Sequence, residues 1–477
     1  MKKIIALLLS LIILAGSASQ GLVSFAIDIE PELSVYDFAE DLSQLIRAYS
    51  EDNVTDEQMR EDVVVTVDKF FNNSQATELN GLSLNSFETR RLIVKSAESI
   101  DYCGAIDSVS GYNDLYILQY DSMTSAKEAY EYYLTLDYID YVEPDIIMSC
   151  QGVDDIFNEF EPEIIFPEDG VSASDITNYL SDKIGFNDIK NELKERINDD
   201  YVLVAVIDSG ADTDHELLQD RIIDSGVNYS GTGIQNSCED DYGHGTHVAG
   251  IIASNTLDNV KIEAYKVLND SGKGSLSAIS VAIDVAVADG ADIINLSLTA
   301  KGESERMTEA INNAVANDVN VVVAAGNNEA DLDKQYYTPA CVESAITVSA
   351  TDENARLASF SNYDGTIDIA ALGIGVKSSY LDNTYAILSG TSMAAPQVAA
   401  GLAIVKTVFP ELSVSECEEK IEEYAIKIYE LPGSNKFGAG LLFLKYLLGD
   451  KPTTPNPVFS VEDCEFSQAF DLLRRVQ

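Results

Sequence analysis

Between residues 181 and 448, apolar runs typical of buried strands alternate with segments whose apolar residues recur at helical spacing. The runs that carry this pattern are residues 201–207, 244–254, 262–268, 277–288, 293–298, 305–316, 319–324 and 345–350. Continuous apolar strands separated by helices are typical of a parallel sheet with both faces covered. The pattern therefore predicts an α/β fold with a doubly wound, mostly parallel sheet, in which a ligand would bind beyond the carboxyl ends of the strands.

A different pattern, typical of a small α+β unit, covers residues 91–150. Residues 91–95 and 115–120 are predicted to be strands, because β-branched and aromatic residues are frequent in both. Residues 125–136 have the spacing of a helix, and residues 141–145 follow a third short strand. We therefore expect a separate small α+β domain before the larger one.

The other parts of the chain have weaker patterns. Residues 27–90 are acidic and show apolar residues at helical spacing only in part. Residues 151–180 are acidic, carry two prolines and show little periodicity, so they are predicted to be a linker. Residues 449–477 open with three prolines and are predicted to be a C-terminal tail.

The N-terminus has the form of an export signal. Two lysines follow Met1, and the apolar run at 4–18 is too short to span a membrane comfortably. Small residues two apart at 16–18 and at 24–26 offer cleavage sites, so residues 1–26 are interpreted as a signal peptide, with an uncleaved signal anchor as the alternative. Ser17 stands where a lipoprotein signal needs cysteine, so no lipid anchor is expected.

Composition limits the partners of the chain. The 477 residues include 30 Lys and Arg against 80 Asp and Glu, a net charge of 30 − 80 = −50. Phosphate contact needs a basic face, so this charge argues against nucleic-acid binding. Hydrophobic residues make up 46% of the chain, which favours a folded protein. The six cysteines form no C-x-x-C pair and have no metal-ligand spacing.

A serine in a frame of small residues is the first candidate for chemistry. Ser392 follows Gly390 and Thr391 and precedes two alanines and a segment compatible with a helix. Gly390 removes side-chain bulk beside the hydroxyl, and a helix that begins at Ser392 would turn free N–H groups toward developing negative charge. These are the requirements of a nucleophile in acyl transfer, although such a serine taken alone is more often a helix cap.

Three further residues could act with this serine. Asp208 ends a buried strand, where a carboxylate either caps a turn or orients an imidazole. His244 stands between glycines at the start of a helix, and His247 follows three residues later. A zinc site would need a third ligand, for which only His215 remains, so zinc is disfavoured. Asn327 ends another strand and offers an amide donor for an oxyanion.

The order Asp, His, Ser, each in its own glycine-bearing frame, resembles that of the subtilisin-like serine proteases, or subtilases. Residues 91–150, with Val-Glu-Pro-Asp at 142–145, resemble the inhibitory propeptide that precedes such enzymes. The resemblance implies that Ser392 is the nucleophile, His244 the general base and Asp208 the residue that holds the imidazole. It also implies that Asn327 and the Ser392 N–H form the oxyanion hole.

The resemblance extends to two stretches that bind substrate backbone on either side. An extended peptide would be held between them by main-chain hydrogen bonds. The residues implied are Gly272, Lys273 and Gly274 on one side and Ser297, Leu298 and Thr299 on the other. The chain departs from the family pattern at Thr299 and Ala300, which replace two glycines, and at Tyr337, which replaces the glycine at the base of the first specificity pocket. These changes predict a preference for small residues there.

No cofactor is expected to be required. The segment between Gly250 and Lys266 is shorter than in subtilisin, and the missing part resembles a loop that wraps calcium, so that site is not assigned. The acidic run Glu239-Asp240-Asp241 could bind calcium weakly, but solvated charge is the favoured interpretation.

These features lead to one prediction and two alternatives. We expect a secreted serine endopeptidase that acts on polypeptides, with a catalytic domain at 181–448 and a propeptide at 91–150 that acts as its intramolecular inhibitor. It is expected to be a monomer that binds no nucleic acid. The first alternative is a processing protease of narrow specificity, and the second is a non-catalytic protein of the same fold that captures peptides.

Overall fold

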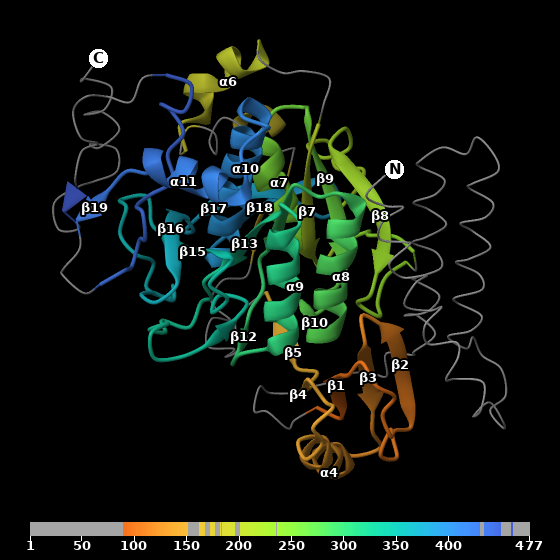
Figure 1. Ribbon diagram of the computed structural model, residues 1–477. Helices are drawn as coiled ribbons and strands as arrows, with labels where there is room; N and C mark the ends of the chain where they lie inside the picture. Colours follow the sequence, from red (N-terminus) through yellow and green to blue (C-terminus); the bar gives the residue numbers. More distant parts are fainter. Residues whose placement is uncertain are drawn as a thin grey trace. The chain divides into compact units, whose positions relative to one another are not determined.

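A computed structural model of the chain describes residues 89–150, 162–166, 172–176, 182, 184–195, 201–234, 236–429, 434–449 and 459–460 (Figure 1). Within these residues the chain divides into two units, and the boundary falls between Asp145 and Ile146. The predicted propeptide domain therefore ends five residues before Cys150, because 146–150 belong to the second unit. The predicted signal peptide, almost all of 27–90 and nearly all of the tail lie outside the described residues.

The first unit is a four-stranded antiparallel sheet with one helix packed on it. The strands, in the order β2-β3-β1-β4, are β2 (Asp107–Tyr112), β3 (Leu115–Gln119), β1 (Arg91–Lys95) and β4 (Tyr141–Pro144). The helix α4 (Met123–Tyr133) begins after Ser122, whose side chain accepts a hydrogen bond from the Ser125 N–H. Ala126, Ala129 and Tyr133 of α4 pack with Leu92 and Leu118 of the sheet. The unit is α+β as predicted, but β2 was missed, and residues 141–144, predicted to follow a third strand, are themselves the strand β4.

The second unit is built on a seven-stranded parallel sheet, which confirms the doubly wound α/β prediction. Its strands, in spatial order, are β16 (Ile367–Leu372), β15 (Ile346–Thr351), β13 (Asn320–Ala324), β11 (Ile293–Leu296), β7 (Val202–Asp208), β9 (Val260–Lys266) and β8 (Ile222–Asn228). Every residue of β7, β11 and β13 is buried, as expected for central strands covered on both faces. The edge strand β8 was missed because it mixes apolar with polar residues and glycine.

Helices cover both faces of this sheet. They are α6 (Phe186–Lys194), α7 (His244–Ser254), α8 (Leu276–Asp289), α9 (Glu305–Ala316), α10 (Thr391–Val408) and α11 (Val414–Tyr424). Val204 and Val206 of β7 share one apolar cluster with Val248 of α7 and Val398 of α10. Side chains alternate along a strand, so Ala205 and Ile207 face the other side, where α8 and α9 pack against one another (Figure 1). The α7 and α10 helices lie side by side, which brings their N-termini to the carboxyl end of the sheet.

Short sheets complete the second unit. β17 (Val376–Tyr380) and β18 (Thr384–Leu388) form a hairpin that ends just before Ser392, and β6 (Glu163–Ile165) pairs with β18. The other pairs are β5 (Ile147–Ser149) with β10 (Lys273–Ser275), β12 (Ala300–Lys301) with β14 (Tyr337–Thr338), and β19 (Ile428–Tyr429) with β20 (Phe459–Ser460).

The linker predicted at 151–180 differs from the structure in two places. β6 adds a third strand to the β17–β18 hairpin, and residues 173–176 are helical, with Ile176 buried in the main core. The edge strand β6 has only three residues and is held by backbone hydrogen bonds to its neighbour. Such a strand is too short to show an alternation of apolar and polar side chains in the sequence. As for membrane association, the described helices include none with the length and apolarity that crossing a bilayer requires.

Candidate active site

Asp208 and His244 form a buried hydrogen-bonded pair at the carboxyl end of β7. Asp208 is shielded from solvent completely, and its Oδ1 accepts hydrogen bonds from His244 Nδ1 at 2.8 Å and from the Ser209 N–H at 2.7 Å. Because a carboxylate can only accept, Nδ1 carries a proton. In the neutral form of the imidazole, Nε2 is therefore the nitrogen that can take a proton.

The start of α7 is held in place by Asp240. One oxygen of the Asp240 carboxylate accepts from the Tyr242 and Gly243 N–H groups, both at 2.9 Å. The other accepts from the Thr246 N–H at 3.0 Å and from its hydroxyl at 2.7 Å. Asp240 therefore binds donors of the first turn that no helical carbonyl can take. Asp240 was predicted to be a solvated charge, although an aspartate a few residues before a helix is itself a capping signal.

The two histidines of α7 have opposite electrostatic environments. Burial disfavours the charged form of His244, but the Asp208 charge, the Asp208 hydrogen bond and the Asp240 charge outweigh it, so the pKa of His244 is raised. Burial lowers the pKa of His247 to about 3, with a further contribution from His244. The His247 imidazole is thus neutral near neutral pH, and its Nε2 lies 3.2 Å from the Ala386 carbonyl oxygen. This supports a structural role for His247.

Asn327 and Ser392 meet at the start of α10. The Asn327 side-chain oxygen accepts from the Thr391 N–H and from the Thr391 hydroxyl, both at 2.9 Å. This fixes the amide, so that Nδ2 is its donor, and a Cβ added to Gly390 would lie 3.4 Å from that nitrogen. The Asn327 amide and the N-terminus of α10 therefore offer donors beside Ser392.

The Ser392 hydroxyl lies within hydrogen-bonding distance of two backbone carbonyls, that of Ser297 at 3.1 Å and that of Cys150 at 3.3 Å. Within the described residues it makes no hydrogen bond to His244. Proton transfer to His244 therefore requires a hydrogen bond that this arrangement of the two side chains does not contain.

Residues 147–150 run as an extended strand past this serine. On one side, β5 pairs antiparallel with β10, in the register Ser149 to Lys273 and Met148 to Gly274. On the other side, the Ser149 and Thr299 backbones exchange hydrogen bonds at 3.0 and 2.9 Å. The two stretches predicted to bind substrate backbone thus flank a segment of this chain.

The Cys150 side chain is enclosed by the protein. Its Sγ lies 3.6 Å from the Gly272 carbonyl oxygen, and its backbone N–H donates to the same oxygen at 3.3 Å. A Cβ added to Gly272 would meet this sulfur and the Tyr242 ring at 2.8 Å each. Burial raises the pKa of the Cys150 thiol, and the Asp208 charge raises it further. The space around the thiol is therefore small, and the field there opposes negative charge.

Three other residues predicted to bind substrate are buried or closely packed in the described structure. Leu298 is buried at 1% exposure, and a Cβ on Gly274 would approach the Val267 carbonyl oxygen to 2.3 Å, so glycine is required there. Tyr337 packs in an apolar cluster with Ala325 and is 4% exposed. Tyr337 lies in β14, which pairs antiparallel with β12. Its effect on specificity stays a prediction.

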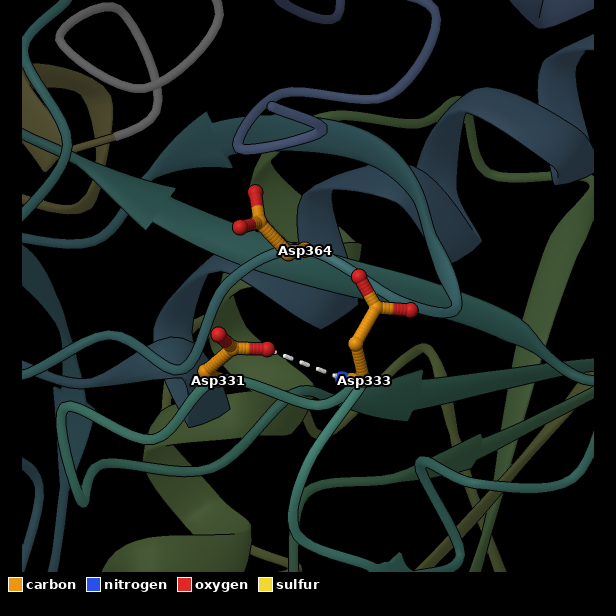
Figure 2. A group of neighbouring side chains, drawn as sticks. All are labelled: Asp331, Asp333 and Asp364. Atoms are coloured by element: carbon orange, nitrogen blue, oxygen red, sulfur yellow. Dashed lines mark hydrogen bonds between the residues drawn. The ribbon is translucent and has the colours of Figure 1, made fainter. Parts of the chain in front are cut away.

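Two acidic groups in the described residues have the spacing of metal ligands. Figure 2 shows Asp331, Asp333 and Asp364 around one point. Asp331 already accepts from the Asp333 N–H and pairs with Lys334, and Asp364 accepts from the Asn435 N–H. These partners account for the group without an ion.

The second acidic group consists of Asp368, Glu418 and Glu422. Burial raises the pKa of Asp368 and that of Glu418 to about 7, so both carboxyls are partly protonated near neutral pH. The acidic run at 239–241, for which solvated charge was the favoured interpretation, lies elsewhere. Glu239 binds the Thr213 hydroxyl, Asp240 caps α7 and Asp241 pairs with Lys266.

Comparison with known proteins decides the family. Residues 199–442 match the model of the subtilase family, Peptidase_S8. The chain belongs to this family. Subtilisin DY of Bacillus licheniformis is 36% identical over 50% of this chain and 88% of its own length. Subtilisin Savinase of Lederbergia lenta is 37% identical over the same shares, and the minor extracellular protease Epr of Bacillus subtilis is 33% identical over 60% of this chain and 46% of its own length. The subtilase is a serine-type endopeptidase.

We expect Asp240→Asn to shift the pH dependence of this subtilase. A general base must be neutral, so kcat/KM rises as pH passes the pKa of His244. The Asp240 charge raises that pKa, so its removal should move the rising limb to lower pH. The measurement is kcat/KM on a peptide substrate between pH 5 and 9, values chosen to span about two units around an ordinary histidine pKa.

Thr246→Val is the matched control for the hydrogen bonds that Asp240 makes at the start of α7. It removes a hydroxyl that binds Asp240 but keeps the charge, so its rising limb should stay at the wild-type position. A limb that moves equally in both variants, or in neither, would contradict the electrostatic role of Asp240.

Proposed function

We propose that the chain is an exported serine endopeptidase made as a precursor, and that the first bond it cuts is in its own backbone, just after residues 147–150. One observation carries this proposal. That segment lies between β10 and Thr299 as an added strand, and the Cys150 carbonyl oxygen is 3.3 Å from the Ser392 hydroxyl. Backbone pairing of an extended peptide is a general mode of recognition that any sequence can satisfy.

The proposed reaction uses four side chains. The Ser392 oxygen attacks a peptide carbonyl carbon while its proton passes to His244 Nε2, and Asp208 stabilises the imidazolium that forms. The tetrahedral oxyanion receives hydrogen bonds from Asn327 Nδ2 and the Ser392 N–H. His244 then gives its proton to the leaving amine, which leaves an acyl-enzyme. Water attacks that ester with His244 as base, which releases the acid and restores the serine.

The unit that ends at Asp145 is proposed to be the propeptide. It is joined directly to the segment held beside Ser392, so the same connection would keep the site blocked until the chain is cut and the unit leaves. Export is supported by the basic and apolar N-terminus of the sequence and by a relative whose name calls it extracellular. No metal or cofactor enters the proposed reaction.

Two alternatives have observations of their own. A processing protease of narrow specificity is favoured by the enclosed Cys150 side chain, which limits the sequences that fit. A non-catalytic peptide-binding protein is favoured by the Ser392 hydroxyl, which faces two carbonyls in place of His244. Covalent labelling of Ser392 by a fluorophosphonate would exclude the binding protein.

The direct test of the proposal is Ser392→Ala in the full chain. We expect the wild-type precursor to yield a fragment whose N-terminus is Gln151, and the variant to stay intact, because removal of the hydroxyl leaves no nucleophile. The measurement is N-terminal sequencing and intact mass after purification. A variant cut at the same bond would show that another protease makes the cut, and a new N-terminus far from residue 151 would contradict the assignment of residues 147–150.

Substitutions of Cys150 test whether its side chain must be small. We expect Cys150→Ala to self-cleave within about threefold of the wild-type rate and Cys150→Leu to be slowed at least about fivefold, because overpacking a closed space costs roughly 1–3 kcal/mol. Cys150→Asp should also be slow, because the nearby Asp208 charge opposes a second carboxylate. The rate is followed by the loss of precursor on a gel.

Ser149→Leu is the matched control, since the Ser149 side chain is only half-buried in the neighbouring position. It should leave the rate within about threefold of wild type, because added bulk there is not enclosed. Self-cleavage of Cys150→Leu as fast as the wild type would contradict selection at this position.

A further inference from the structure

The nucleophile of the proposed reaction sits in a helix that contains a proline. α10 runs from Thr391 to Val408 without a break, and Pro396 lies within it. In an α-helix the carbonyl of one residue accepts from the N–H four residues later, and proline has no N–H. The carbonyl of Ser392 therefore lacks the helical donor that residue 396 would normally supply.

A side chain from the sheet supplies the missing donor. The Ser297 hydroxyl, which follows β11, donates to the Ser392 carbonyl oxygen at 3.0 Å. Asn295 Nδ2 donates in turn to the Ser297 hydroxyl oxygen, also at 3.0 Å, which leaves the hydroxyl proton for Ser392. Ser297, Asn295 and Pro396 are all fully or almost fully buried, so water is not an easy substitute.

Ser297 thus holds the nucleophile at two points. Its side chain binds the Ser392 carbonyl, and its own backbone carbonyl lies 3.1 Å from the Ser392 hydroxyl. Only the first contact depends on the side chain. The Ser297 hydroxyl thus holds the backbone of Ser392, from which the Ser392 side chain must reach His244.

We propose that Ser297 is a positioning residue for the nucleophile, because its hydroxyl replaces the backbone donor that Pro396 removes from α10, and that Asn295 orients this hydroxyl. This inference rests on the proposed role of Ser392. It assigns to the Ser297 side chain a function separate from the substrate contact expected of its backbone. A buried carbonyl left without a donor is unfavourable, and a helix can relieve it by shifting its first turn, which would move the Ser392 side chain.

The dependence on Pro396 gives a test that a purely structural role would not pass. In Pro396→Ala the alanine N–H can donate to the Ser392 carbonyl, so the Ser297 hydroxyl becomes dispensable. Ser297→Ala should therefore lower kcat about tenfold in the wild-type background, with KM within about twofold, and less than about threefold in the Pro396→Ala background. Ser297→Thr keeps the hydroxyl and should restore most of the rate.

The measurements are kcat and KM on a peptide substrate and the rate of fluorophosphonate labelling of Ser392. The samples are chains expressed at full length and allowed to process themselves. Ser349→Ala is the matched control. Ser349 is also a buried serine whose hydroxyl donates to a backbone carbonyl, that of Lys436 at 2.7 Å, but it lies in β15 and its hydrogen-bond partner is not a site residue. It should lower the melting temperature without a change in labelling rate.

Equal losses from Ser297→Ala in both backgrounds, or no loss in either, would overturn the positioning role. A wild-type chain that the probe does not label would instead overturn the proposed function itself, so the two failures can be told apart. If Ser297→Ala does not fold, the comparison of Ser297→Thr with wild type and of the double variant with Pro396→Ala still decides the question.

Discussion

The site depends on a negative charge kept away from water at the end of β7. Asp208 is completely buried, and a buried carboxylate is tolerated only where donors surround it. The Ser209 N–H and His244 Nδ1 both donate to one of its oxygens. The Ser209 hydroxyl accepts from the Gly245 N–H at 2.8 Å, so the same turn also fixes the first residues of α7. The strand end, the helix start and the orientation of the imidazole are thus one arrangement, and none can shift alone.

Backbone hydrogen bonds make up most of the recognition around this charge. Residues 147–150 are bound by the main chain of β10 and Thr299, and the Ser392 hydroxyl lies within hydrogen-bonding distance of the Ser297 and Cys150 carbonyls. Side chains select at a few enclosed positions, such as that of Cys150 beside Tyr242 and Gly272. An enzyme built in this way accepts many sequences at most positions and restricts a few.

The sequence was informative where a residue is constrained by its immediate neighbours. Two of the runs in the sequence pattern, 244–254 and 305–316, coincide with the bounds of α7 and α9. The candidate site residues stand in glycine-bearing frames because backbone approaches closely there. A Cβ on Gly245, for example, would lie 2.1 Å from the Gly210 carbonyl oxygen. Such contacts leave a signature within a few letters of the sequence.

What the sequence did not reveal depends on partners distant in the chain. β6 and β2 are edge strands whose pairing has no local pattern. The tie between Cys150 and Ser392 joins residues 242 positions apart, and the Ser297 hydroxyl reaches a carbonyl 95 positions away. Asp240 and Pro396 each carry a readable local cue, an acidic cap and a missing donor, but the group that completes the interaction is visible only in the fold.

The central claim is that Asp208, His244 and Ser392 act as one catalytic unit, and Asp208→Asn tests it most directly. Asparagine preserves the shape of the buried group but not its charge, so the imidazolium that forms during the reaction loses its counter-charge, and the amide N–H groups can compete with the acceptor that sets the tautomer of His244. The measurement is the rate of fluorophosphonate labelling of Ser392 in the full chain, with the melting temperature as the check on folding. The account predicts a folded variant whose labelling is slower by at least about 10²-fold. Labelling of Asp208→Asn at the wild-type rate would contradict it.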